Sequence, residues 1–135
     1  MPVIQKIRMA FLMLCLFSCA GLQFSQQSLI DTEQVTDAAI TLLGKSNNPF
    51  SQHSTEVEKL KQQVQEIYRK EQLRKMNVAT ISMWSEVMNG DGNLFALLDL
   101  WKSNGTLSPA MRVESVRKIE RLLNSIYDLE MHKKS

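Results

Sequence analysis

The feature that most constrains the fold of this chain is the helical spacing of its apolar residues between residues 29 and 131. In the middle of the chain, steps of three and four residues connect Val57, Leu60, Val64 and Ile67. Nearer the C-terminus, the same spacing gives one broad apolar face made of Val113, Val116, Ile119, Leu122, Leu123, Ile126 and Leu129. No segment of this region alternates convincingly between apolar and polar residues. The sequence therefore predicts an all-α fold, a small bundle of about four helices.

Capping residues mark the ends of the first and last helices. Asp31 can cap a first helix that begins at Leu29 or Asp31, and Gly44 can end it. Ser108 followed by Pro109 is typical of a helix start, because proline fits the first helical position. These signals predict where the bundle begins and where its last helix begins.

Residues 55–88 form the longest helical stretch. Thr55 followed by Glu58 is a capping-box pattern that opens it. At 1.5 Å per residue an unbroken helix here would be about 50 Å long. We expect either one long central helix or two helices with a break near Asn77, where weak helix formers gather. Asn93 can then cap a short, buried helix, "LFALLDLW".

The charged residues favour a solvated surface. Glu71 and Lys75 are spaced i,i+4 with the acid first, which is the favourable order on an exposed helix face. A solvated helix face is also expected for a basic cluster composed of Arg69, Lys70, Arg74 and Lys75. Anionic lipid head groups or an acidic partner are the alternative contacts for this cluster. From Cys19 onward, 14 basic residues balance 14 acidic ones, so charge gives no case for a nucleic-acid partner.

The N-terminus has the pattern of a signal peptide. Residues 1–8 contain two basic residues and no acid, and residues 9–18, "MAFLMLCLFS", are nearly all apolar. Ten residues are too short to span a bilayer, which needs about 20, but they match the hydrophobic region of a signal peptide. A buried first helix is the alternative, but such a helix should have a polar face, and this run has none.

Residues Leu16, Phe17, Ser18 and Cys19 resemble the lipobox of bacterial lipoprotein precursors. Three of the four match that pattern, whereas Phe17 stands where a small or β-branched residue is usual. The resemblance covers only about the first 19 residues. It implies cleavage between Ser18 and Cys19, a diacylglyceryl group on the Cys19 thiol, and often a further acyl chain such as palmitate on the new amino group. Two or three such chains anchor a protein far more firmly than one.

The resemblance divides the chain into a signal peptide (1–18), a lipidated cysteine with its tether (19–28) and a helical domain (29–135). Cys15 would leave with the signal, so lipidation also explains why one cysteine remains unpaired. Cys19 is followed by Ala20 rather than Asp, which resembles the sorting pattern of outer-membrane lipoproteins. Ordinary cleavage a few residues later would instead give a secreted protein.

No motif indicates catalysis. The chain contains no G-x-S-x-G, no H-E-x-x-H and no Gly-rich phosphate loop. His53 and His132 are isolated, so we expect neither a metal site nor a cofactor. The turn at residues 89–93 resembles the start of a calcium loop, but Leu94 and Leu100 stand where Gly and Glu are needed. We therefore expect a protein that is not an enzyme.

One aromatic group is a candidate partner-binding patch, namely Met83, Trp84, Phe95 and Trp101. The alternative is that these residues pack in the core. Taken together, the sequence predicts a lipid-anchored envelope protein of the outer membrane that binds or assembles another envelope protein. Pilotins and surface-exclusion proteins are analogies of size and location. The alternative is a soluble secreted helical protein, either an effector or a carrier of a small apolar ligand.

Overall fold

The computed structural model of the chain describes residues 23–134. The predicted signal peptide, its cleavage after Ser18 and the lipidation of Cys19 lie outside these residues. Within them, every regular element is helical, which confirms the all-α prediction. The elements are α2 (Gln26–Leu43), a short 3-10 helix η1 (Phe50–Gln52), α3 (Ser54–Gln72), α4 (Val78–Asn89), α5 (Leu94–Asn104) and α6 (Pro109–His132).

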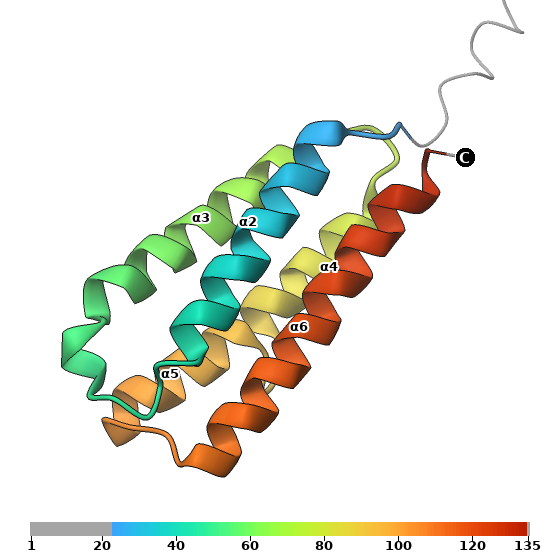
Figure 1. The fold of residues 1–135 in the computed structure, drawn as a ribbon. Helices are drawn as coiled ribbons and strands as arrows, with labels where there is room; N and C mark the ends of the chain where they lie inside the picture. The colour runs from blue at the N-terminus through green and yellow to red at the C-terminus, as the bar shows by residue number, and fades with distance from the viewer. Residues whose placement is uncertain (1–22, 135) are drawn as a thin grey trace, which may run out of the picture.

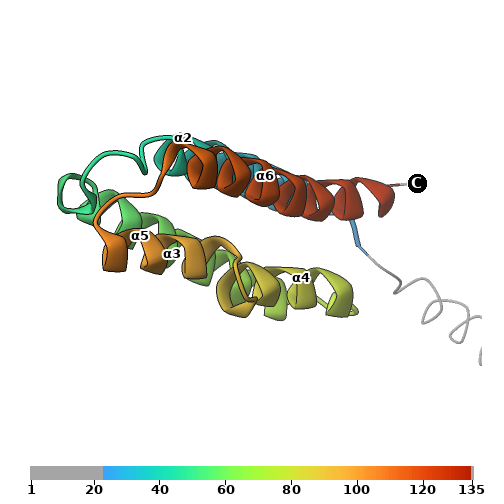
Figure 2. The ribbon, with the colours of Figure 1, turned by 90° about the horizontal axis from the view of Figure 1, so that it is seen from below.

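The helices form two layers (Figures 1 and 2). Helices α2 and α6 lie side by side in one layer, and α3, α4 and α5 form the other. Helices α4 and α5 follow one another along the same side of the molecule. Together they form one rod of the bundle, which runs antiparallel to α3. The five α-helices of the described region thus form the four rods of a small bundle.

The two tryptophans lie in the core, so the predicted partner-binding patch is wrong and the alternative is confirmed. Trp84 and Trp101 are 1% and 0% exposed, while Met83 and Phe95 pack partly buried against the same core. The indole N–H of Trp101 donates to the carbonyl oxygen of Asn48 at 2.9 Å, so its polar group is satisfied without solvent. The packing of α4 and α5 against the other rods covers these side chains.

Residues 55–88 form two helices, and the break near Asn77 is the predicted alternative that the structure confirms. Helix α3 ends at Gln72 and α4 begins at Val78. Met76 has a φ of 54°, in the left-handed region, which cannot continue a right-handed helix. The amide of Asn77 donates to both the backbone carbonyl and the carboxylate of Glu71, which stabilises the turn.

Helix α2 begins earlier than the sequence predicts. Ser25 is its N-cap, and the Ser25 hydroxyl accepts from the backbone N–H of Ser28 at 3.1 Å. The backbone N–H of Ser25 donates to Glu130 at 2.7 Å, a contact between distant parts of the chain. Asp31 therefore lies inside the helix and does not cap it. Residues 25–28, expected in the tether, belong to the bundle.

The starts of the other helices agree only in part with the predicted caps. Helix α3 begins at Ser54, after His53, so Thr55 lies inside the helix and the expected capping box is absent. Asn93 does precede α5, but its side chain makes no capping hydrogen bond there. Ser108 caps α6 as predicted, its hydroxyl accepting a backbone N–H of the first turn.

Candidate functional site: the polar end of the bundle

A buried group of polar side chains lies where α2 begins, α3 ends, α4 begins and α6 ends. We call it the polar cluster; its members are Ser28, Glu71, Arg74, Asn77, Thr80, Glu130 and Lys133. Glu71 and Glu130 are 2% and 1% exposed, and the Lys133 side chain is 4% exposed. Charges buried this deeply are stable only when they are paired and hydrogen-bonded.

Glu130 is the acceptor at the centre of the polar cluster. Its carboxylate accepts from Arg74 Nη2 at 2.8 Å, from Lys133 Nζ at 2.7 Å and from the backbone N–H of Ser25 at 2.7 Å. Burial alone would raise the pKa of Glu130, but the hydrogen bonds from Arg74, Lys133 and Ser25 outweigh it and hold this pKa below its usual range. Glu130 is therefore an ionised, fully engaged carboxylate.

Glu71 forms the second half of the cluster. It accepts from the Ser28 hydroxyl at 2.5 Å and from Arg74 Nη1 at 2.7 Å, in addition to the Asn77 amide. Arg74 thus bridges the two carboxylates. Burial alone would lower the pKa of Arg74, but the hydrogen bonds and charges of Glu130 and Glu71 outweigh burial, so the pKa of Arg74 is raised above its usual value. Two anions and two cations share the site, so its formal charge is balanced.

The polar cluster holds the first described residues of the chain against this end of the bundle. The Arg74 guanidinium donates to the backbone carbonyl of Gln23, and Glu130 holds the backbone N–H of Ser25. Between them, the Phe24 ring lies 5.5 Å from the Lys134 ammonium. Arg74, in the α3–α4 connection, and Glu130, in α6, therefore fix where the first described residues lie on the bundle.

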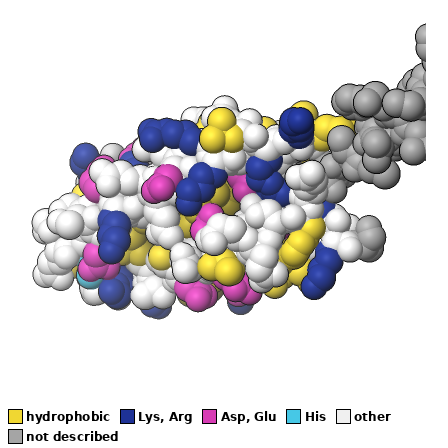
Figure 3. Space-filling view, turned by 90° about the horizontal axis from the view of Figure 1, so that it is seen from above, with side chains coloured by type: hydrophobic (Ala, Val, Ile, Leu, Met, Phe, Trp, Pro, Cys, Tyr) yellow, Lys and Arg dark blue, Asp and Glu magenta, His cyan; other side chains and the backbone are white. Residues whose placement is uncertain are grey.

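Three large apolar side chains are exposed beside the polar cluster. Leu73, Met76 and Val78 are 86%, 64% and 77% exposed, and we call them the apolar loop. A shallow, mostly apolar groove of about 130 Å³ continues from Met76 along Ala79 to Leu129. In Figure 3, yellow apolar and dark blue basic side chains lie near one another at the end of the molecule where the described chain begins, and other dark blue side chains are spread over the rest of this face. This end therefore combines a buried, hydrogen-bonded polar interior with exposed apolar side chains.

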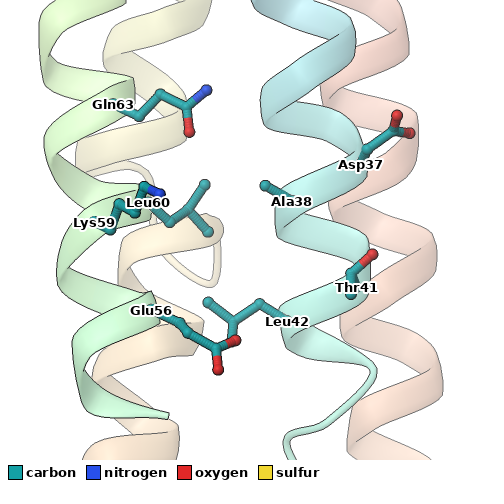
Figure 4. A pocket seen from close by; sticks show the side chains of 8 residues that line it. All are labelled: Asp37, Ala38, Thr41, Leu42, Glu56, Lys59, Leu60 and Gln63. Atoms are coloured by element: carbon teal, nitrogen blue, oxygen red, sulfur yellow. The ribbon is translucent and has the colours of Figure 1, made fainter.

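A second surface feature is the groove between α2 and α3, of about 390 Å³ (Figure 4). Ala38 and Leu42 of α2 and Leu60 of α3 form its apolar floor, and the Ala38 and Leu60 side chains point toward one another. The rim is polar and is made of Asp37, Thr41, Glu56, Lys59 and Gln63. A hydrogen bond with His53 lowers the pKa of Glu56, so this rim carboxylate is ionised. We call this feature the α2–α3 groove.

The sequence interpretation missed the polar cluster. Glu71 was expected on an exposed face with Lys75, and Arg74 in a solvated cluster; instead the two pair with each other inside the bundle, because α2 and α6 cover them. A signal was present. Glu71 continues the seam Leu60, Val64 and Ile67, and Glu130 continues Ile119, Leu123 and Ile126, both at helical spacing. A carboxylate on an apolar seam predicts a buried partner.

Comparisons of the chain with protein-family models, with curated proteins and with solved structures found no match. Among residues 23–134, no three His, Cys, Asp or Glu side chains are grouped to hold a metal ion. Across the same residues, no helix has the length and apolar character needed to cross a bilayer. The candidate sites therefore rest on the geometry of the polar cluster, the apolar loop and the α2–α3 groove.

Proposed function

We propose that the chain is a lipid-anchored protein of a bacterial cell envelope, held in the outer membrane by acyl chains on Cys19. In this proposal the helical domain binds or assembles another envelope protein. The observation that carries it is the closeness of the lipobox-type cysteine to the bundle. Only four residue steps separate Cys19 from Gln23, whose carbonyl is bound by Arg74. A fully extended chain covers about 14 Å in four steps.

An anchor so close to the bundle has a direct consequence for the domain. Because Arg74 and Glu130 hold residues 23 and 25, the polar end of the bundle stays next to the lipid. The domain would then stand at the membrane surface and not on a long flexible linker. A protein held in this way is suited to contact other proteins of the same membrane.

The α2–α3 groove supports the protein-binding part of the proposal. An apolar floor between polar rims is the kind of surface that takes one face of an amphipathic helix. Its rim carries acids from both helices and Lys59, so charged residues of a partner helix would find complementary groups. We therefore assign the groove to a helix of a second envelope protein.

The intact mass of the mature protein from a membrane fraction tests the anchor. We expect a chain that begins at Cys19 and carries the added mass of two or three acyl chains. Cys19→Ala should leave the precursor uncleaved. Cys15→Ala is the matched control, because this cysteine lies in the removed segment and its loss should change neither processing nor mass. A soluble, unacylated chain cut after residue 19 would contradict the proposal and favour the secreted alternative.

A further inference from the structure

We propose that the apolar loop is a second membrane contact, in which Leu73, Met76 and Val78 enter the head-group region of the bilayer that holds Cys19. This inference rests on the proposed lipid anchor and adds a protein-based contact to it. Leu73 and Met76 lie in the connection between α3 and α4, and Val78 is the first residue of α4. All three are at the end of the bundle where the described chain begins. The occupant is therefore the lipid surface itself.

The geometry of the chain places this loop near the lipid. Arg74 lies inside the loop and binds the Gln23 carbonyl directly, so the loop and the chain toward Cys19 meet at one guanidinium. With a reach of about 14 Å from Cys19 to Gln23, an anchored protein cannot move this end of the bundle far from the bilayer. Exposed side chains at this end of the bundle would therefore contact the lipid of the bilayer that holds Cys19.

The charges at this end fit an anionic membrane. Three segments form it, residues 23–30, 72–81 and 131–134, and none of them contains an acidic residue. Of the acids next to these segments, Glu71 and Glu130 are buried in ion pairs with Arg74 and Lys133. Asp31, which is 9% exposed, lies 3.8 Å from Lys70 Nζ. Lys75 and Lys134 remain at the surface. Basic side chains near an apolar contact add electrostatic attraction to anionic head groups.

The conformation of Met76 supports an external contact. The left-handed region is unfavourable for a residue other than glycine, and Met76 has a left-handed backbone and is 64% exposed. Its side chain therefore improves neither the local backbone nor the core. Methionine is flexible and polarisable, which suits it to an irregular apolar surface such as lipid. Three side chains on a loop are also too few for a stable protein interface, which buries more than about 1,000 Å².

Fluorescence quenching in the acylated full chain tests the contact. Val78→Cys provides the single free thiol of the mature protein, because the Cys19 thiol is blocked by lipid and Cys15 is removed. The thiol is labelled with a small environment-sensitive dye, and the protein is placed in vesicles of phosphatidylethanolamine and phosphatidylglycerol that carry nitroxide head groups. Ser103→Cys, exposed at the opposite end of the bundle, is the matched control.

We expect nitroxide lipids to quench the label at position 78 by more than half and the label at position 103 by less than a tenth. In the Val78→Cys background, Leu73→Ser with Met76→Gly should bring the quenching down to the control level while helix content stays the same. Both residues are exposed, so their replacement leaves the core intact.

Three results would overturn the inference, and they are distinguishable. Equal quenching at both positions, in protein that floats with the vesicles, removes the loop contact and leaves the anchor standing. Protein that carries no acyl chain and does not float removes the anchor and the inference together. A label at position 78 that aqueous iodide cannot reach, yet lipid does not quench, shows that a second copy or another protein covers the loop.

Discussion

Glu130→Gln is the substitution that tests the polar cluster most directly, because Glu130 is the shared acceptor of Arg74 and Lys133. The glutamine has nearly the same shape and keeps one carbonyl oxygen, so the change removes mainly the negative charge. Lys133 would then stay buried at 4% exposure with only the neutral partners Asn77 and Thr80. Leaving one charge of a buried pair without its partner costs about 3–5 kcal/mol.

We expect Glu130→Gln to fall near the lower end of this range, at about 3 kcal/mol, for two reasons. Arg74 retains its ion pair with Glu71, and the new amide still accepts one hydrogen bond. A domain of this size unfolds with a free energy of about 5–15 kcal/mol, so the loss is large enough to measure. The loss in free energy of unfolding is measured by urea titration of residues 20–135, with circular dichroism as the signal.

A double-mutant cycle separates the ion pair from general disruption. Lys133→Met added to Glu130→Gln removes the unpaired cation, so it should restore about 2 kcal/mol of the lost free energy of unfolding. Glu120→Gln is the matched control, because Glu120 is exposed on the same helix and its loss should cost less than about 0.5 kcal/mol. A cost below about 1 kcal/mol for Glu130→Gln, or two additive losses in the cycle, would refute the reasoning.

The remaining predictions concern pH, the core, the α3–α4 turn and the groove. Because the pKa of Glu130 is lower in the folded chain than in the unfolded one, its contribution to stability is present above the unfolded pKa of about 4.3 and is lost as the pH falls through the folded pKa. The difference in urea midpoint between wild type and Glu130→Gln should therefore narrow from pH 7 to pH 3, and a constant difference would contradict this. Trp101→Ala removes the largest core contact of α5 and should lower the free energy of unfolding by about 3–5 kcal/mol, measured by urea titration. Met76→Gly removes the unfavourable left-handed conformation of a non-glycine residue and should raise the free energy of unfolding by up to about 1 kcal/mol. A clear decrease in the free energy of unfolding would mean that the Met76 side chain stabilises the turn. A photocrosslinker at Gln63 should capture an envelope protein, and Ala38→Arg, which fills the groove floor, should abolish that product, whereas a crosslinker at Ser125 on α6 should give none.

The helical spacing by itself determined the part of the core that α3 contributes, whereas Val113, which the same spacing placed on the apolar face near the C-terminus, is 46% exposed. Val57, Leu60, Val64 and Ile67, predicted to form one seam, are all buried in α3. The cap at Ser108 also follows from local chemistry, since a capping side chain acts on its own neighbours in the chain. The break near Asn77 was one of two alternatives that the sequence left open, and the structure decided between them. The lipobox-type pattern at Cys19 is equally local, and its role stays a prediction.

Only the tertiary structure decided which charges are buried together. Glu71 and Glu130 are 59 residues apart, yet Arg74 bridges them. Sequence spacing pairs Glu71 with Lys75 one turn later, because it describes a single helix and not the helices packed against it. The same reason explains Trp101, whose burial depends on neighbouring rods and whose N–H finds Asn48 in a distant loop. A helical period shows which residues share a face, but the packing of the rods decides whether that face meets solvent, a core or a buried partner.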